Sequence, residues 1–136
     1  QGMGQHGLEP IARMISSAVV GVPPRIMGIG PVEASKKALA KAGLGWDDLD
    51  VIELNEAFAA QSLACIRSWN LPDDDPRINP NGGAIALGHP LGMTGARILL
   101  SAARQLRRTG GKHALVTLCI GVGQGYAAVI QNTSSS

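Results

Sequence analysis

Three side chains that could carry acid–base or nucleophilic chemistry follow short apolar runs in this sequence, namely Asn55, His89 and Cys119. His89 stands between Gly88 and Pro90, and the proline biases the histidine toward extended geometry, so that its imidazole is aimed. An imidazole held in this way can transfer protons or stabilise an oxyanion. The alternative is a tight turn whose histidine only caps backbone groups, and this stretch alone does not decide between the two.

Cys119 is followed by three alternate glycines, Gly121, Gly123 and Gly125. Glycine leaves backbone N–H groups unobstructed, and such donors can stabilise an oxyanion. A thiol beside them can act as a nucleophile or as a proton carrier. The alternative is an inert core cysteine, since free cysteine is often buried. For Asn55 the alternative is an N-cap of the helix that we expect to follow it.

The elements that must position these side chains follow from the apolar pattern, in which strands alternate with helices. We expect strands at Glu9–Gly21, Val51–Leu54, Ala84–Leu87, Ala114–Cys119 and Tyr126–Gln131. We expect helices at Pro31–Ala42, Asn55–Trp69 and Leu91–Thr109. Such alternation predicts an α/β fold with a mostly parallel sheet between helical layers and an antiparallel hairpin at one edge. The three candidate side chains would then meet at the carboxyl ends of the strands, where ligands gather.

The whole chain is expected to form one domain, with a loose lead-in at Gln1–Gly7 and a frayed tail at Asn132–Ser136. The helical spacing of apolar residues predicts that Phe58 is buried and that Arg97 points outward. The acidic loop Pro72–Pro76 is expected to be exposed.

Composition excludes several classes of function. A net charge of +2, with no aromatic residues interleaved among the basic ones, argues against nucleic acid as a partner. No apolar run reaches the length of a membrane span, and nothing resembles a signal peptide. The two cysteines are far apart, which favours a reducing compartment and a cytoplasmic location. Because the chain begins with Gln1, we expect it to be a piece of a longer protein, and an organellar targeting segment could precede it.

Two further motifs fail on inspection. The run G-V-G-Q-G lacks the following helix whose N-terminus would hold a dinucleotide pyrophosphate. His89 and Cys119 supply too few ligands, at the wrong spacing, for a zinc-type metal site.

Four motifs in the same order as in the family make the chain similar to the C-terminal domain of the thiolases. They are M-G-I-G-P (Met27–Pro31), N-E-A-F-A (Asn55–Ala59), N-G-G-A-I-A-L-G-H-P-L-G (Asn81–Gly92) and C-I-G-V-G-Q-G (Cys119–Gly125). The resemblance extends over Leu8–Ile130, and the cysteine motif and the P-N-G-G context look most like the β-ketoadipyl-CoA thiolases. It implies an α-β-α layered domain with a five-stranded mixed sheet.

The family reaction is the thiolytic cleavage of a 3-ketoacyl-CoA, or the reverse Claisen condensation of two acyl-CoA molecules. The resemblance implies that His89 stabilises the thioester oxyanion and helps to activate the nucleophile, and that Asn55 holds a water completing that oxyanion hole. It implies that Cys119 is the general acid and base for the α-carbon proton, and that the N–H of Gly121 belongs to a second oxyanion hole. The residues implied to line the acyl–pantetheine pocket are Met27, Ala57 and Phe58.

The family also needs a nucleophilic cysteine and a coenzyme A loop from an N-terminal half, and Cys65 lies in the wrong context to replace that cysteine. We therefore expect half of an acyltransferase active site that is inactive alone and needs the N-terminal thiolase half as a partner. Coenzyme A thioesters would be substrates, with no covalently bound cofactor. We expect the unpaired apolar surface to produce a homo-oligomer.

Two alternatives stay open. The first is a non-catalytic module that uses a thiolase-like fold for binding or assembly. The second is the ketoacyl-synthase group, which uses two histidines opposite its cysteine, whereas here Cys119 occupies the later site.

Overall fold

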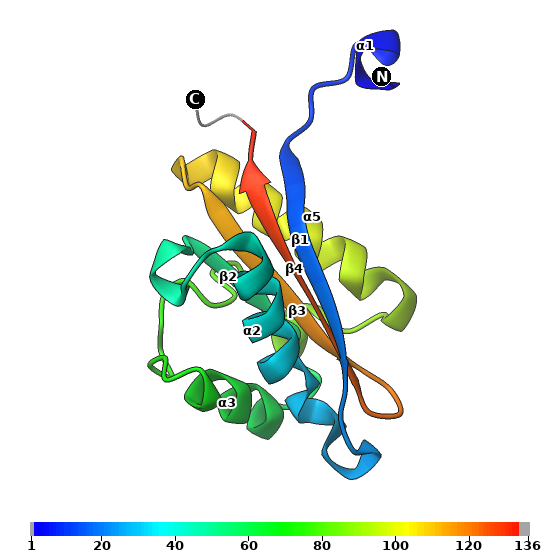
Figure 1. The fold of residues 1–136 in the computed structure, drawn as a ribbon, viewed down its shortest axis with the longest axis vertical. Coiled ribbons are helices and arrows are strands. Elements are labelled where there is room, and N and C mark those ends of the chain that lie inside the picture. The colour runs from blue at the N-terminus through cyan, green and yellow to red at the C-terminus, as the bar shows by residue number, and fades with distance from the viewer. Residues whose placement is uncertain (1, 134–136) are drawn as a thin grey trace.

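The computed structural model describes residues 2–133, and its helices and strands alternate along much of the chain (Figure 1). The strands are β1 (Ala12–Gly21), β2 (Val51–Leu54), β3 (His113–Ile120) and β4 (Gln124–Asn132). The α-helices are α1 (Gly2–His6), α2 (Gly30–Ala42), α3 (Ala59–Ser68), α4 (Ala84–Leu87) and α5 (Leu91–Thr109), and two 3₁₀ turns are η1 (Pro24–Ile29) and η2 (Trp46–Asp48). The predicted bounds of β2 and α5 are confirmed residue for residue.

The sheet has four strands in the order β1-β4-β3-β2 and is mixed, so the expected five-stranded, mostly parallel sheet is wrong. Only β2 and β3 pair in parallel, whereas β4 runs antiparallel to both β1 and β3. The β3–β4 hairpin therefore lies in the interior of the sheet and not at its edge. All that extends the sheet beyond β2 in the described chain is a single parallel bridge between Ile52 and Ile78.

The predicted third strand, Ala84–Leu87, is instead the one-turn helix α4. Gly83 precedes it and Gly88 follows it, with Gly88 at φ 95°, a left-handed value that glycine adopts without strain. A carboxylate oxygen of Glu56 accepts the Ile85 N–H at 2.9 Å and so stabilises the first turn. Four apolar residues between glycines fit a strand or a helical turn equally well, and a residue distant in sequence decides between them.

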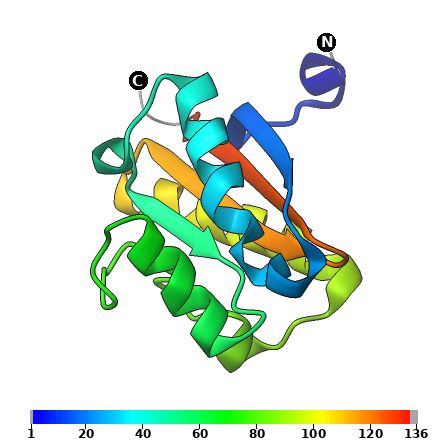
Figure 2. The ribbon, with the colours of Figure 1, turned by 60° about the horizontal axis from the view of Figure 1, so that its bottom comes forward.

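Helices cover both faces of the sheet, so the α/β class and the α-β-α layering are confirmed (Figure 2). On one face, α2 and α3 bury an apolar cluster against the strands that includes Leu39, Ile66 and Leu115. On the other face, α5 packs Ile98 and Leu106 against the sheet. Many of the buried side chains are alanines, which let the helices approach the strands closely.

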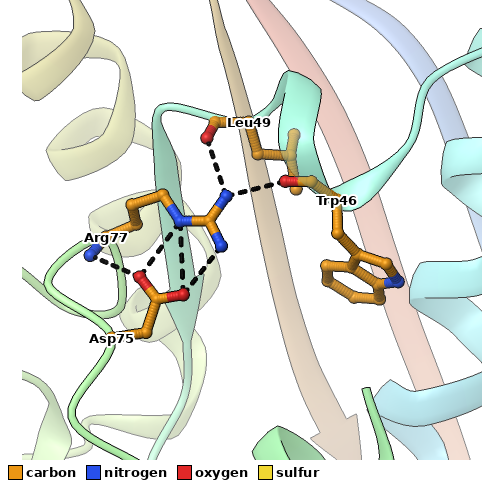
Figure 3. A network of polar contacts seen from close by, with 4 residues as sticks. All are labelled: Trp46, Leu49, Asp75 and Arg77. Carbon is orange, nitrogen blue, oxygen red and sulfur yellow. Dashed lines mark hydrogen bonds and ion pairs between the residues drawn. The ribbon is translucent and has the colours of Figure 1, made fainter. Parts of the chain in front are cut away.

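The segment that follows α3 is fastened to the body of the domain by Arg77 (Figure 3). The guanidinium of Arg77 donates to both oxygens of Asp75 and to the carbonyls of Trp46 and Leu49, the last two at 2.7 and 3.2 Å. Asp75 is buried, which corrects the expectation that the whole acidic loop is exposed. The Arg77 guanidinium lowers the pKa of the Asp75 carboxyl. This contact holds the neighbouring Ile78 against β2.

At the ends of the chain, Gly2–His6 forms the short exposed helix α1, which stands apart from the sheet in Figure 1, in place of the expected loose lead-in. Asn132, expected in a frayed tail, is the buried last residue of β4. Thr133 is an exposed bend, and residues 134–136 of that tail lie outside the described residues. Within residues 2–133, no helix has the length and apolar character that crossing a bilayer requires.

Candidate active site

Asn55 and His89 lie in contact, with the amide nitrogen Nδ2 of Asn55 3.3 Å from the ring nitrogen Nε2 of His89. Asn55 follows β2 directly, and its own N–H donates to the Thr117 carbonyl at 3.0 Å, so it continues the parallel pairing with β3. The alternative role of Asn55 as a helix cap is wrong, because α3 begins only at Ala59, with Phe58 as its N-cap. The side chain of Asn55 is therefore free to bond the histidine.

The second ring nitrogen of His89 is held by Thr94, a residue that sequence analysis missed. Nδ1 lies 2.7 Å from the Thr94 hydroxyl oxygen, and that hydroxyl donates to the carbonyl of Pro90 at 3.0 Å. The Asn55 amide nitrogen can only donate, and the single hydroxyl proton is used on Pro90. Both contacts are satisfied when Nδ1 carries the proton and Nε2 carries the lone pair, an assignment made from the bonding partners. Nε2 is thus a proton acceptor that faces the Asn55 amide.

Cys119 lies near the end of β3, at the same edge as this pair. Leu54 pairs with Thr117, so Asn55 and Cys119 stand one and two residues beyond the same rung of the sheet. Within the described residues, however, no hydrogen bond joins the thiol to Asn55 or His89. Side-chain alternation from Leu115 places the thiol toward the α2–α3 layer. Burial raises the pKa of the Cys119 thiol, which favours its protonated form.

The three glycines after Cys119 differ in whether their surroundings leave space for a Cβ atom. A Cβ at Gly125 would lie 2.1 Å from the carbonyl carbon of Gly30, and a Cβ at Gly123 would lie 2.2 Å from the carbonyl oxygen of Val22. These two glycines are required because the β3–β4 hairpin packs closely against the segment from β1 to α2. At Gly121, in contrast, a Cβ would have nothing within 4 Å. Of the three, only Gly121 borders open space.

The three residues expected to line an acyl pocket are exposed or half-buried. Phe58 is 66% exposed, and the prediction that it is buried is wrong, because α3 starts after it. Ala57 is half-buried in the link between β2 and α3. Met27 is half-buried in η1, where its carbonyl accepts the N–H of Gly30.

The guanidinium nitrogens of Arg97 are buried in the described structure, although a solvent-facing side chain was expected. Arg97 is on α5 and attracts Glu53, a fully buried carboxyl on β2. Burial raises the pKa of Glu53 to about 7, against the opposing attraction of Arg97. The buried Arg97 guanidinium thus places a positive charge near β2, the strand directly before Asn55.

A cleft of about 700 Å³ lies between α3, the segment around Asp75 and α4, but Asn55, His89 and Cys119 do not line it. Residues 2–133 contain no group of three or more His, Cys, Asp or Glu side chains arranged to hold a metal ion. The candidate groups thus lie at an edge of the sheet, outside this cleft.

Comparisons with known proteins show which family the chain resembles. A family model described as "Thiolase, C-terminal domain" matches residues 8–132. Over 93% of the chain, it is 59% identical to a 3-oxoadipyl-CoA/3-oxo-5,6-dehydrosuberyl-CoA thiolase of Escherichia coli K12 and 58% identical to a β-ketoadipyl-CoA thiolase of Pseudomonas aeruginosa. The crystal structure of human mitochondrial 3-ketoacyl-CoA thiolase superposes on 98% of the chain with a TM-score of 0.92 and 51% identity.

The matches also define how much of those proteins the chain represents. It spans 31% and 32% of the two bacterial relatives and 33% of the human structure, or about a third of each.

Proposed function

The chain belongs to the thiolase family, and we propose that it supplies the oxyanion-binding and proton-transferring residues of a thiolase active site. The proposed reaction is thiolytic cleavage of a 3-ketoacyl-CoA, or the reverse Claisen condensation of two acyl-CoA molecules. The observation that carries the proposal is the hydrogen bond between Asn55 and His89, which joins two of the four family motifs across 34 residues. Coenzyme A thioesters are the substrates, and the proposal includes no covalently bound cofactor.

We propose a β-ketoadipyl-type acyl group as the preferred substrate. The support is that the bacterial relatives at 59% and 58% identity carry names of this substrate class.

The nucleophile of the proposed reaction comes from outside this chain. Cys65 is fully buried, and its thiol donates to the Gly28 carbonyl at 3.4 Å while it accepts from the Gln61 side chain. Burial raises the pKa of Cys65 to about 11, so this thiol forms little thiolate at neutral pH. Neither access nor acidity suits Cys65 to carry an acyl group.

His89 acts first as a base and then as a hydrogen-bond donor. With its Nδ1 proton bonded to Thr94, its Nε2 lone pair takes the proton of the incoming nucleophilic thiol. The resulting imidazolium carries a proton on Nε2, which donates to the thioester oxyanion. The amide of Asn55 beside it holds the water that provides a second donor.

Cys119 moves the α-carbon proton. When the nucleophile has attacked the 3-keto carbonyl, the bond between C2 and C3 breaks and leaves an acetyl-CoA enolate. The Cys119 thiol, which burial keeps protonated, gives its proton to the enolate carbon and becomes a thiolate. Free coenzyme A then returns a proton to Cys119 as its own thiolate attacks the acyl-enzyme. The open side of Gly121 leaves room for the other oxyanion, which forms when the nucleophile attacks the 3-keto carbonyl.

The experiment that tests this function is complementation. The 136-residue chain is mixed with the N-terminal two-thirds of the Escherichia coli relative, and thiolysis of acetoacetyl-CoA is followed by loss of substrate absorbance. We expect no turnover by either piece alone and turnover by the mixture that His89→Ala abolishes. A mixture that assembles without turnover would favour the non-catalytic module, and turnover by the isolated chain would refute the division of residues proposed here.

Several expectations remain predictions. They are the contribution of Met27, Ala57 and Phe58 to an acyl pocket, a homo-oligomeric state and a cytoplasmic location.

A further inference from the structure

Asn79 is bound to the end of β2 as if it were a neighbouring strand. Its side-chain oxygen accepts the Leu54 N–H and its side-chain nitrogen donates to the Leu54 carbonyl, both at 2.9 Å. Its own N–H donates to the Ile52 carbonyl at 2.8 Å. Asn79 has φ 46°, a left-handed conformation that asparagine tolerates better than most residues. Leu54 is the residue directly before Asn55, so this contact fixes where Asn55 leaves the sheet.

Glu56 joins Asn79 to the helix that leads to His89. One carboxylate oxygen accepts the Asn79 side-chain N–H at 3.1 Å, and the other accepts the backbone N–H of Ile85 in α4 at 2.9 Å. Hydrogen bonds to a charged acceptor are stronger than neutral ones. A single carboxylate therefore connects the segment directly after Asn55 to α4, the turn that ends two residues before His89.

Gly83 gives an independent sign of how closely this carboxylate is held. A Cβ at Gly83 would lie 2.3 Å from the Glu56 carboxyl carbon. The backbone of Gly83 is extended, with φ −104° and ψ −163°, which any residue adopts. A side chain at position 83 would therefore displace the Glu56 carboxylate, although the backbone conformation itself would accept it.

We propose that Glu56 is a positioning residue that, with Asn79, clamps the end of β2 to α4 and so sets the contact between Asn55 and His89. Asn55 and Glu56 are adjacent in the chain, and α4 is followed by Gly88 and His89, so both partners of the site hydrogen bond start from the clamped segments. The effect of Glu56 on catalysis rests on the proposed function, whereas its effect on the contact between Asn55 and His89 does not.

The geometric claim is tested on the 136-residue chain by long-range ¹H–¹⁵N correlation spectra of the His89 ring nitrogens. In Glu56→Gln, one of the two donors faces an amide NH₂ group in place of an oxygen, so one hydrogen bond is lost. We expect the ratio of Nδ1–H to Nε2–H tautomer at His89 to fall about fivefold to tenfold, as the loss of one hydrogen bond implies. The matched control is Glu33→Gln, which removes an exposed carboxylate paired with Lys36 and should leave the His89 signals unchanged.

A double-mutant comparison keeps the test informative if single variants lose stability. Gly83→Ala should displace the carboxylate and shift the His89 signals in the wild-type chain. In a Glu56→Ala background there is no carboxylate to displace, so adding Gly83→Ala should cause no further shift. Equal shifts in both backgrounds, or His89 signals that ignore Glu56→Gln while the Ile85 amide moves, would overturn the clamp.

The catalytic meaning is tested in the complemented enzyme. Glu56→Gln should lower kcat about 100-fold with KM within about twofold, since a small misplacement of catalytic groups has this effect on rate. A wild-type mixture without turnover would contradict the proposed function, but it would not affect the conclusion drawn from the tautomer ratio of His89. Wild-type turnover with an unchanged kcat in Glu56→Gln would defeat the positioning role alone.

Discussion

The hydroxyl of Thr94 lies 2.7 Å from Nδ1 of His89, and Thr94 itself is fully buried in the first turns of α5. The helix that follows His89 thus holds the imidazole from one side while Asn55 contacts it from the other. With the ring nitrogens assigned by these partners, the basic nitrogen Nε2 faces Asn55, which directly follows β2 at the edge of the sheet.

Replacing Thr94 with valine, which has nearly the same shape, should release Nδ1. We expect a mixture of tautomers at His89 in ¹⁵N spectra and a fall in kcat of about 10- to 100-fold in the complemented enzyme. Thr94→Ser keeps the hydroxyl and should retain most of the activity. Equal losses in the two variants would show that packing, and not the hydroxyl, is what His89 needs.

Glu53 should make the chain less stable as the pH rises. Its folded pKa of about 7 lies above the ordinary value of 4.5, so the folded state binds the proton more tightly. Its stabilising contribution is complete below pH 4.5 and is lost between 4.5 and about 7, by about 3 kcal/mol at about 1.4 kcal/mol per pKa unit.

Urea unfolding of the wild type and of Glu53→Gln across this pH range measures the effect. The variant should lack this loss, because glutamine does not titrate. A wild-type slope that persists in the variant would assign the pH dependence to another group.

Asp75 should contribute in the opposite pH direction. Its folded pKa is lowered by Arg77, so its stabilisation is present above the ordinary pKa near 4 and is lost as the pH falls through the lower folded value. Asp75→Asn should destabilise the chain by about 1–3 kcal/mol at pH 7, because Arg77 loses a charged acceptor. Thermal unfolding should find the exposed control Asp74→Asn unchanged, and an equal loss in that control would contradict the role of the buried pair.

The glycines of the β3–β4 turn should respond unequally to alanine. Gly125→Ala forces a methyl group into the backbone of Gly30 and should cost at least about 1–3 kcal/mol in the free energy of unfolding. Gly121→Ala meets open space and should stay within about 0.5 kcal/mol of the wild type. Chemical denaturation compares the two directly, and similar losses would mean that Gly121 is also structural.

Local patterns were enough to predict much of this fold. The bounds of the amphipathic α5 and of the apolar β2 could be predicted from the residues next to them. The glycine that follows the predicted α2, Gly43, ends that helix in a left-handed conformation. The strand directions could not be predicted in this way, because an apolar run does not indicate which neighbouring strand it pairs with. The sheet was therefore predicted as mostly parallel when β4 in fact lies antiparallel between β1 and β3.

The candidate site was also predictable only in part. Residue type and nearby glycines or prolines were enough to identify Asn55, His89 and Cys119 as candidates. Glu56 and Thr94 did not, because their roles depend on partners that only the fold supplies. Glu56 bonds Ile85 across 29 residues, and its position directly after Asn55 suggested only the first turn of a helix.

The division of labour between His89 and Cys119 is the central claim, and exchange of the α-protons of acetyl-CoA with deuterated solvent tests it most directly. In the complemented enzyme, Cys119→Ala should abolish this exchange while a thioester still acylates the nucleophilic cysteine, and His89→Ala should abolish both. Undiminished α-proton exchange in Cys119→Ala would contradict the account, because the proton would then be moved by a group outside the edge formed by β2 and β3.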